Sequence, residues 1–320
     1  MPSATTVAAA LSFAVVSAQW FLPKTNSTAV VRQALGYEKI HVAGHSAGGS
    51  SVFTQARYFP AAVKSVIAEA PWPTWTRNRW PLDEYYASRT AYAQLLSPYV
   101  GQVLNGHEFS LLDIDRAQKV LDKKPYTFKW NGKTAQFDGA ALMHRLYVDF
   151  PDDPKPLAAF LAAIANGDRS GLKAFVGEPK EAVIEQGDFP WGLHLASVCG
   201  DIGEAKLTKY EALALVKAEP GLLGFESILA CPWWSTIGDV PVEHSRPPSL
   251  DIPVLVITGE YDTCCGRRIV DEIRPVSPVV QAVDLPGRGH GVMGDCRNEA
   301  VRQFLDNPTA PVDVSCLSEE

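Results

Sequence analysis

A serine between glycines is the first feature of this sequence with the makings of a reactive site. The run Gly44-His45-Ser46-Ala47-Gly48 fits the pattern G-x-S-x-G, which places a serine hydroxyl on a sharp turn between a strand and a helix. The two glycines are expected to let this turn, called the serine turn (residues 44–48), close without steric clash. A chain of this composition contains the pattern by chance about 0.1 times, so the pattern alone indicates a nucleophile without establishing it.

A serine hydroxyl is a poor nucleophile until a base takes its proton, and the base needs a carboxylate to orient it. In chains with this pattern, the acid and then the histidine follow the serine. Asp262 ends a predicted strand, and His290 lies in the glycine-rich run 287–291, beyond the last predicted strand. The sequence therefore predicts a catalytic triad of Ser46, Asp262 and His290. The backbone N–H of Ala47, at the start of a helix, is expected to face the oxyanion.

The elements around these residues have the order of an α/β fold. Strands are expected over residues 39–43, 63–68, 252–258 and 279–285, and helices over residues 27–35, 50–58, 267–273 and 298–305. Their alternation predicts an α/β fold with a mostly parallel sheet. The unbroken apolar run 252–258 is typical of a strand buried on both faces. Asp262 is then expected at the carboxyl edge of the sheet, where such folds place catalytic groups.

The sheet pattern stops after residue 71 and returns at residue 250. Between these points the sequence predicts mainly helical segments, over 113–121, 140–147, 156–165 and 209–218. We therefore predict an α/β core from residues 1–71 and 250–320, and an inserted helical cap, residues 72–249, of a size that suits a domain of its own. Aromatic residues of this insertion either line a substrate cleft or pack between helices. They are Trp72, Trp75, Trp80, Tyr85, Tyr86, Tyr92, Trp233 and Trp234.

The composition excludes several classes of protein. The 320 residues are 46% hydrophobic and 20% charged, with a net charge of −7, so no basic surface is expected for a nucleic acid. The only long uncharged apolar run, residues 7–18, is shorter than the roughly 20 residues that span a bilayer. No cofactor is expected. No metal site is expected either, because His41 and His45 lie on either side of a turn rather than on one helical face. The expected partner is a small-molecule or peptide substrate, and the sequence does not predict the oligomeric state.

The first residues and the cysteines bear on the compartment. Residues 1–18 combine an apolar stretch with small residues near its end, as in a signal peptide, but no basic residue precedes Lys24. A buried helix or strand is the alternative interpretation of this stretch. The six cysteines are an even number without the paired C-x-x-C spacing of a zinc site, which favours disulfides. We expect a secreted or periplasmic protein, in which Asn26 would open a glycosylation triplet.

Together these motifs resemble the α/β-hydrolase superfamily, and within it the tripeptidyl and prolyl aminopeptidase branch of secreted serine peptidases. The resemblance begins near Asn26 and rests on residues 44–48, 253–262, 289–291, 199–201, 231–233 and the tail around Cys296 and Cys316. It implies a doubly wound sheet with a helical cap inserted between two late strands, the same triad by position, and release of residues or short peptides from free N-termini. It also implies the disulfides Cys296–Cys316 and Cys199–Cys231.

Two departures from this family leave alternatives open. Only residues 1–45 precede Ser46, without a glycine pair, so the loop that gives a second oxyanion N–H is expected to be missing. Either the chain is a fragment of a longer gene product, or its sheet is shortened at the N-terminus. Losing one oxyanion donor costs about 10²–10³ in rate, so we expect a slow enzyme or a silent ligand-binding protein. The second departure is Cys264-Cys265 after Asp262, where relatives tend to carry Thr-Pro; the two cysteines bridge each other or pair elsewhere.

The substrate also has two interpretations. The run His-Ser-Ala-Gly-Gly at residues 45–49 is common in lipases and esterases, so a carboxylic-ester hydrolase is the alternative to an aminopeptidase. Asp201 and Glu204 either bind the substrate ammonium that an aminopeptidase requires or lie on a solvated face.

Overall fold

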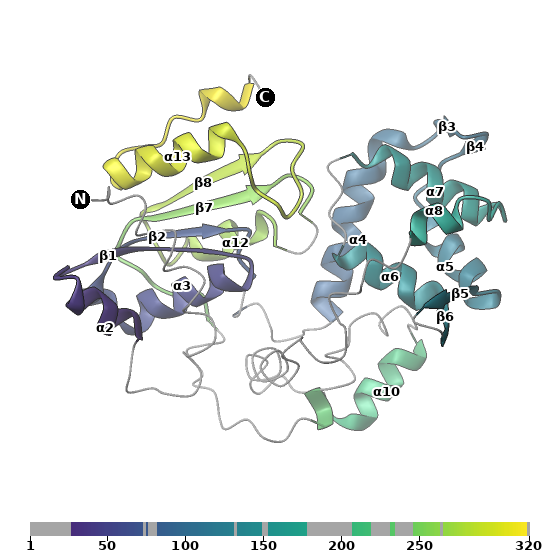
Figure 1. The fold of residues 1–320 in the computed structure, drawn as a ribbon, viewed down its shortest axis with the longest axis horizontal. Coiled ribbons are helices and arrows are strands. Elements are labelled where there is room, and N and C mark those ends of the chain that lie inside the picture. Colours follow the sequence, from purple (N-terminus) through teal and green to yellow (C-terminus); the bar gives the residue numbers. More distant parts are fainter. Residues whose placement is uncertain are drawn as a thin grey trace. The chain divides into compact units, whose positions relative to one another are not determined.

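The fold is known from a computed structural model of the chain (Figure 1). The structure describes residues 27–72, 75, 82–130, 133–148, 153–177, 207–218, 231–233, 246–262 and 265–318. These residues fall into two compact units, the first within residues 1–78 and 240–320 and the second within 79–239. The predicted insertion, residues 72–249, contains the second unit, and its role as a cap stays a prediction.

The first unit is built on one parallel sheet in the order β1-β2-β7-β8. The strands are β1 (Ile40–His45), β2 (Val63–Glu69), β7 (Val254–Gly259) and β8 (Val280–Leu285). Residues far apart along the chain meet at its centre, where Val66 of β2 pairs with Val254 of β7. Because all three strand pairs are parallel and helices cover both faces, the predicted α/β doubly wound fold is confirmed.

Successive side chains of these strands enter two separate apolar clusters, as the period of two in a strand requires. Val66 and Val254 belong to the first cluster, and Ile67 and Leu255 belong to the second. Every residue of β7 is buried, in agreement with the unbroken apolar run that predicted this strand. Buried apolar side chains therefore cover both faces of the sheet whose carboxyl edge carries the candidate site.

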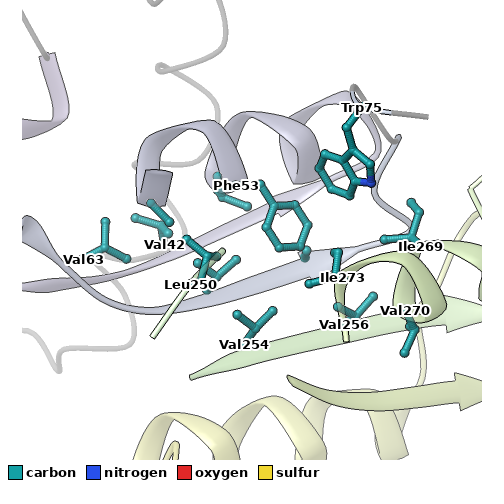
Figure 2. Close-up of a cluster of buried hydrophobic side chains, with 14 residues drawn as sticks. Val42, Phe53, Val63, Trp75, Leu250, Val254, Val256, Ile269, Val270 and Ile273 are labelled. Carbon is teal, nitrogen blue, oxygen red and sulfur yellow. The ribbon is translucent and has the colours of Figure 1, made fainter. Parts of the chain in front are cut away.

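Helices close both faces of the sheet. The first cluster holds Phe53 of α3 (Ala47–Tyr58) and Ile273 of α12 (Arg268–Ile273), as Figure 2 shows. The second holds Phe304 of α13 (Asp295–Asp306). Among the described residues of this unit, the remaining helical elements are α2 (Ser27–Ala34) and the 3₁₀ turns Pro60–Ala62 and Ser315–Ser318.

The second unit is mainly helical among its described residues. Its helices are α4 (Leu82–Leu96), α5 (Asp113–Lys123), α6 (Gly139–Val148), α7 (Lys155–Ala165), α8 (Leu172–Val176) and α10 (Lys209–Ala218), with 3₁₀ turns at Ser97–Tyr99 and Cys231–Trp233. Two hairpins join them, β3 (Val103–Leu104) with β4 (His107–Glu108), and β5 (Tyr126–Trp130) with β6 (Lys133–Phe137). Neither α4 nor these hairpins are among the elements predicted above, although an Asn-Gly pair, typical of hairpin turns, separates the strands of each hairpin.

Packing in the second unit centres on α5, which contacts α6 and α7. Leu121, Leu142 and Leu161, one from each of these helices, are fully buried. Helix α7 is buried on most sides, as expected for a helix that is apolar all round. Within the described part of the chain, no helix has the length and hydropathy needed to cross a membrane.

A disulfide holds the end of the described chain against the sheet. Cys296 in α13 is bonded to Cys316, with 5.5 Å between their Cα atoms, so this predicted pair is confirmed. Between them, Val312 and Val314 pack against the second apolar cluster. Cys231 is disulfide-bonded, but Cys199 lies outside the described residues, so the pairing of these two stays a prediction.

Removing the Cys296–Cys316 bond is expected to destabilise the first unit. The two cysteines are 20 residues apart, and closing a loop of this length restricts the unfolded chain by about 3 kcal/mol. The double variant C296A/C316A should therefore unfold at a clearly lower urea concentration, followed by tryptophan fluorescence. Wild-type protein with and without reductant is the matched comparison, since reduction should reproduce most of the shift. Equal midpoints for the variant and the oxidised wild type would contradict this expectation.

Candidate functional site

Ser46 stands on a strained turn between β1 and α3. Its backbone has φ 56° and ψ −124°, and residues other than glycine seldom adopt a positive φ of this kind. Main-chain hydrogen bonds fix it: the N–H of Ser46 donates to the Glu69 carbonyl at 2.9 Å, and the Ser46 carbonyl accepts from Gly49 at 2.9 Å and Trp72 at 3.0 Å. Strain of this kind persists only where the surroundings hold it, and it is common at catalytic residues.

The glycines of the serine turn do not share one role. A Cβ on Gly44 would overlap the carbonyl oxygen of Gly48, and a Cβ on Gly49 would come within 2.6 Å of the Pro71 Cβ. A Cβ on Gly48 would meet nothing within 4 Å. The expectation that both motif glycines are sterically required is therefore wrong for Gly48. Glycine is sterically required at positions 44 and 49 instead, because the first turn of α3 passes close to the end of β1 and to Pro71.

The predicted acid and base are in direct contact. His290 Nδ1 donates to Asp262 Oδ2 at 2.9 Å, and the other carboxylate oxygen, Oδ1, accepts from the backbone N–H of Cys265 at 2.9 Å. The Asp262 side chain is 0% exposed and that of His290 is 18% exposed. With Nδ1 carrying the proton, Nε2 of neutral His290 is left as an acceptor. This is the tautomer that a general base needs.

His45 brings the base next to the serine turn. Its Nε2–H donates to the backbone carbonyl of His290 at 2.8 Å, and the two rings lie 4.8 Å apart between centroids. His45 immediately precedes Ser46, which is half-buried, while Ala47 is exposed at the first position of α3. The structure therefore gathers Asp262, His290 and the serine turn at the carboxyl edge of the sheet. Their catalytic roles stay predictions.

A partly buried ion pair that the sequence does not predict links the same parts of the molecule. Arg297, in the first turn of α13, pairs with Glu69 at the end of β2. The Glu69 backbone holds Ser46, and Arg297 lies seven residues after His290 along the chain. The available sign in the sequence is a carboxylate directly after the apolar run 66–68 of β2. Its partner could not be read from spacing, because 228 residues separate the two.

Two titratable side chains close to the sheet have shifted pKa values. Burial, together with the charge of Lys64, lowers the pKa of His41, whose Nδ1 shares a hydrogen bond of 2.6 Å with the Ser65 hydroxyl. Burial raises the pKa of Asp284, which accepts a hydrogen bond of 3.0 Å from Thr258. His41 and His45, the pair considered above for a metal, thus bind different partners.

The loop that carries His290, residues 286–294, lies directly against the end of β7. We call it the histidine loop. A Cβ on Gly259 would overlap the carbonyl oxygen of Gly289 in this loop, and the Tyr261 N–H donates to the Arg288 carbonyl at 2.8 Å. Only glycine at position 259 permits this close approach. The contact sets the separation between Asp262, three residues later, and His290.

Replacing Gly259 by alanine is expected to separate Asp262 from His290. The added Cβ meets backbone, which cannot rotate away, so the unfolding free energy should fall by about 1–3 kcal/mol. A displacement of about 1 Å should lower the hydrolysis rate by about 10²-fold. The matched control is G291A in the same loop, where a Cβ meets nothing within 4 Å. Similar rates for the two variants, measured on one ester substrate, would show that the contact does not position the pair.

The aromatic residues of the predicted cap mostly pack where they are described. Trp75 is buried in the first apolar cluster, edge-to-face with Phe53 at 5.3 Å, and its Nε1–H donates to Glu272 at 3.0 Å. Tyr92 is buried in the second unit, whereas Trp233 is 46% exposed. Several residues named from the sequence lie outside the described residues: Asn26, Trp80, Asp201, Glu204, Trp234 and Cys264.

Several solved structures are similar to this chain at low sequence identity. A proline iminopeptidase from Mycobacterium smegmatis is 19% identical over 90% of this chain and 75% of its own, with a TM-score of 0.41. The esterase Est1E from Butyrivibrio proteoclasticus, solved with ferulic acid, is 16% identical over 88% and 66%, with a TM-score of 0.32. An epoxide hydrolase variant from Bacillus megaterium is 15% identical over 88% and 74%, with a TM-score of 0.36. None of these likenesses bears on the substrate.

A comparison with curated protein sequences gives no significant match. The family model described as the alpha/beta hydrolase fold matches residues 19–293, and this supports an enzyme of the hydrolase type. Because that match covers most of the chain and the sheet is parallel with helices on both faces, the chain belongs to the α/β-hydrolase fold family.

Proposed function

We propose that this protein is a serine hydrolase that works through an acyl-enzyme. In this proposal Ser46 is the nucleophile, His290 the general base and Asp262 the acid that orients it. The observation that carries the proposal is the partly buried hydrogen bond of 2.9 Å between His290 Nδ1 and Asp262 Oδ2. It lies at the carboxyl edge of the sheet, beside a serine whose backbone is held at φ 56°.

The proposed reaction follows from this arrangement. Asp262 keeps the proton on Nδ1, so His290 Nε2 takes the proton of Ser46 as its Oγ attacks the substrate carbonyl. The tetrahedral oxyanion then rests on the Ala47 N–H, which has no intrahelical partner because it opens α3. His290 returns the proton to the leaving group, and water releases the acid by the same steps in reverse. The second oxyanion donor is not assigned.

The preferred substrate is a peptide or aminoacyl compound with a free N-terminus. Support for it comes from the sequence runs around residues 44–48, 253–262 and 289–291, which resemble aminopeptidases. The run His45-Ser46-Ala47 instead favours an ester, since it is common in esterases and lipases. Turnover of aminoacyl anilides beside short acyl esters separates the two, and we expect the anilides to be hydrolysed with the higher kcat/KM.

The test of the nucleophile is a fluorophosphonate probe applied to the full chain. We expect one label per molecule, mapped to Ser46 by peptide mass spectrometry, and no label on S46A. Absence of label on the folded wild type would instead favour a hydrolase-fold protein that binds ligands without catalysis. Label on a different serine would overturn the assignment of Ser46.

The proposed compartment is outside the cytoplasm. The disulfide Cys296–Cys316 supports it, because such bonds persist mainly in oxidising surroundings. The apolar run at residues 7–18 is compatible with export.

A further inference from the structure

Three side chains of different metal-binding chemistry meet at the candidate site. One ligand atom each from Asp262, Cys265 and His290 lies within 4.8 Å of the other two. Asp262 and Cys265 come from the turn after β7, and His290 comes from the histidine loop. The mechanism proposed above uses the carboxylate and the imidazole but not the sulfur. Cys265 keeps its thiol, so the expectation that it forms a disulfide with Cys264 or another cysteine is wrong. The thiol has a place in the site without a role in the reaction.

The spacing of these atoms is close to that of a metal centre. Zinc binds cysteine sulfur at about 2.3 Å and histidine nitrogen or carboxylate oxygen at about 2.0–2.2 Å. Ligands held tetrahedrally at these lengths are roughly 3.3–3.8 Å apart. The Nδ1 to Oδ2 distance of 2.9 Å has to widen slightly, and the longest separation of 4.8 Å has to close by about 1 Å. Side-chain rotation alone can supply movements of this size.

The surroundings restrict which ion fits. Cys265 and Asp262 are almost fully buried, while His290 is half-buried and gives the approach from solvent. Sulfur and imidazole donors select zinc over calcium or magnesium, which take oxygen ligands. One carboxylate balances part of the charge, and the thiolate balances the rest. Three protein ligands leave a fourth position for water, as in open zinc sites.

We propose that Asp262, Cys265 and His290 form an inhibitory Zn²⁺ site that switches the hydrolase off. The Cys265 thiol releases one proton to solvent and binds as thiolate. Zinc takes the place of the proton on His290 Nδ1, and that proton moves to Nε2, so the imidazole stays neutral. An imidazole with Nε2–H has no lone pair for the proton of Ser46. Zinc therefore removes the general base without touching the serine, and this effect rests on the proposed function.

The experiment measures zinc binding and hydrolysis separately on the reduced full chain. Equilibrium dialysis against ZnCl₂ should give one zinc per chain. The same zinc concentrations should lower ester hydrolysis and fluorophosphonate labelling of Ser46 at least tenfold, and EDTA should restore both. Cobalt in place of zinc should give a thiolate charge-transfer band in the near ultraviolet, which reports the sulfur ligand in the wild-type protein itself.

Variants identify the sulfur. C265A, and C265S as a second replacement, should raise the zinc concentration for half-saturation at least tenfold, with inhibition expressed relative to each variant's own zinc-free rate. C264S should bind zinc as the wild type does. H107N should also bind zinc as the wild type does. It removes the histidine of a different histidine–aspartate pair, in which His107 Nε2 lies 3.4 Å from Asp168 Oδ2.

The outcomes separate the two proposals. Equal zinc affinity in wild type and C265A, no cobalt–thiolate band, or loss of binding in C264S instead would overturn the zinc site. A chain that hydrolyses esters but binds no zinc contradicts the zinc site and leaves the hydrolase standing. A chain that binds zinc through Cys265 but shows neither turnover nor labelling contradicts the hydrolase and with it the inhibitory role.

Discussion

Replacing Ser46 by alanine is expected to lower the turnover number by roughly 10⁶-fold, since removing the serine of a Ser-His-Asp triad has an effect of about that size. The fold should survive, because the hydrogen bonds that hold residue 46 use its main chain and not its hydroxyl. Turnover of an acyl ester, normalised to protein concentration and with folding checked by circular dichroism, gives the measurement.

The control for this variant is S51A, one turn further along α3. The Ser51 hydroxyl donates to the Ala47 carbonyl at 3.1 Å, so its loss removes a helix hydrogen bond but no reacting group. We expect S51A to keep the wild-type rate within a few-fold. If S46A retained more than about one hundredth of the wild-type rate, well above what a triad without its nucleophile supports, then Ser46 would not be the nucleophile.

Replacing Asp262 by asparagine is expected to lower kcat by about 10⁴-fold with little change in the fold. The backbone N–H of Cys265 donates to Oδ1 at 2.9 Å, so the asparagine must place its carbonyl oxygen there. Its amide NH₂ then faces His290 Nδ1. Because that nitrogen must now accept a hydrogen bond, the proton moves to Nε2 and the imidazole loses the lone pair that the reaction needs.

The neighbouring strand offers the control for this variant. Asp284 on β8 is half-buried; it accepts a hydrogen bond from Thr258 at 3.0 Å and forms an ion pair with Arg267 at 3.7 Å. D284N therefore removes a nearby carboxylate without facing the histidine, and we expect its rate to stay within about tenfold of wild type. A comparable loss of kcat in both variants would mean that Asp262 acts through local charge and not through the tautomer of His290.

The core of this fold is readable from the sequence because its signals are local. The apolar run 252–258 predicts a strand, and β7 occupies Val254–Gly259. Helix α3 begins at Ala47, earlier than the predicted start at residue 50, because two glycines at its first turn hide a helix that tertiary contacts impose. The hairpin of β5 and β6 was readable in the same way, because Asn131-Gly132, a dipeptide typical of two-residue hairpin turns, separates its strands.

The candidate site is only partly readable for the opposite reason. The order of Ser46, Asp262 and His290 along the chain predicts the triad, since the order reflects which strand ends share an edge. The hydrogen bond from His45 to the His290 backbone and the pair of Glu69 with Arg297 join residues 245 and 228 positions apart. Such contacts depend on where loops pass in space, and residue type and spacing do not determine that.

The pairing of β2 with β7 constrains how the molecule is made. On the ribosome, β1, α3 and β2 emerge before residues 79–239, and β7 emerges only after them. The edge of β2 that pairs with β7 therefore stays unpaired while the insertion is synthesised. Closing so long a connection costs less entropy if the insertion is already compact and brings its two ends together. Early folding of the second unit would therefore assist folding of the first, because it shortens the conformational search by which β7 finds β2 and completes the sheet.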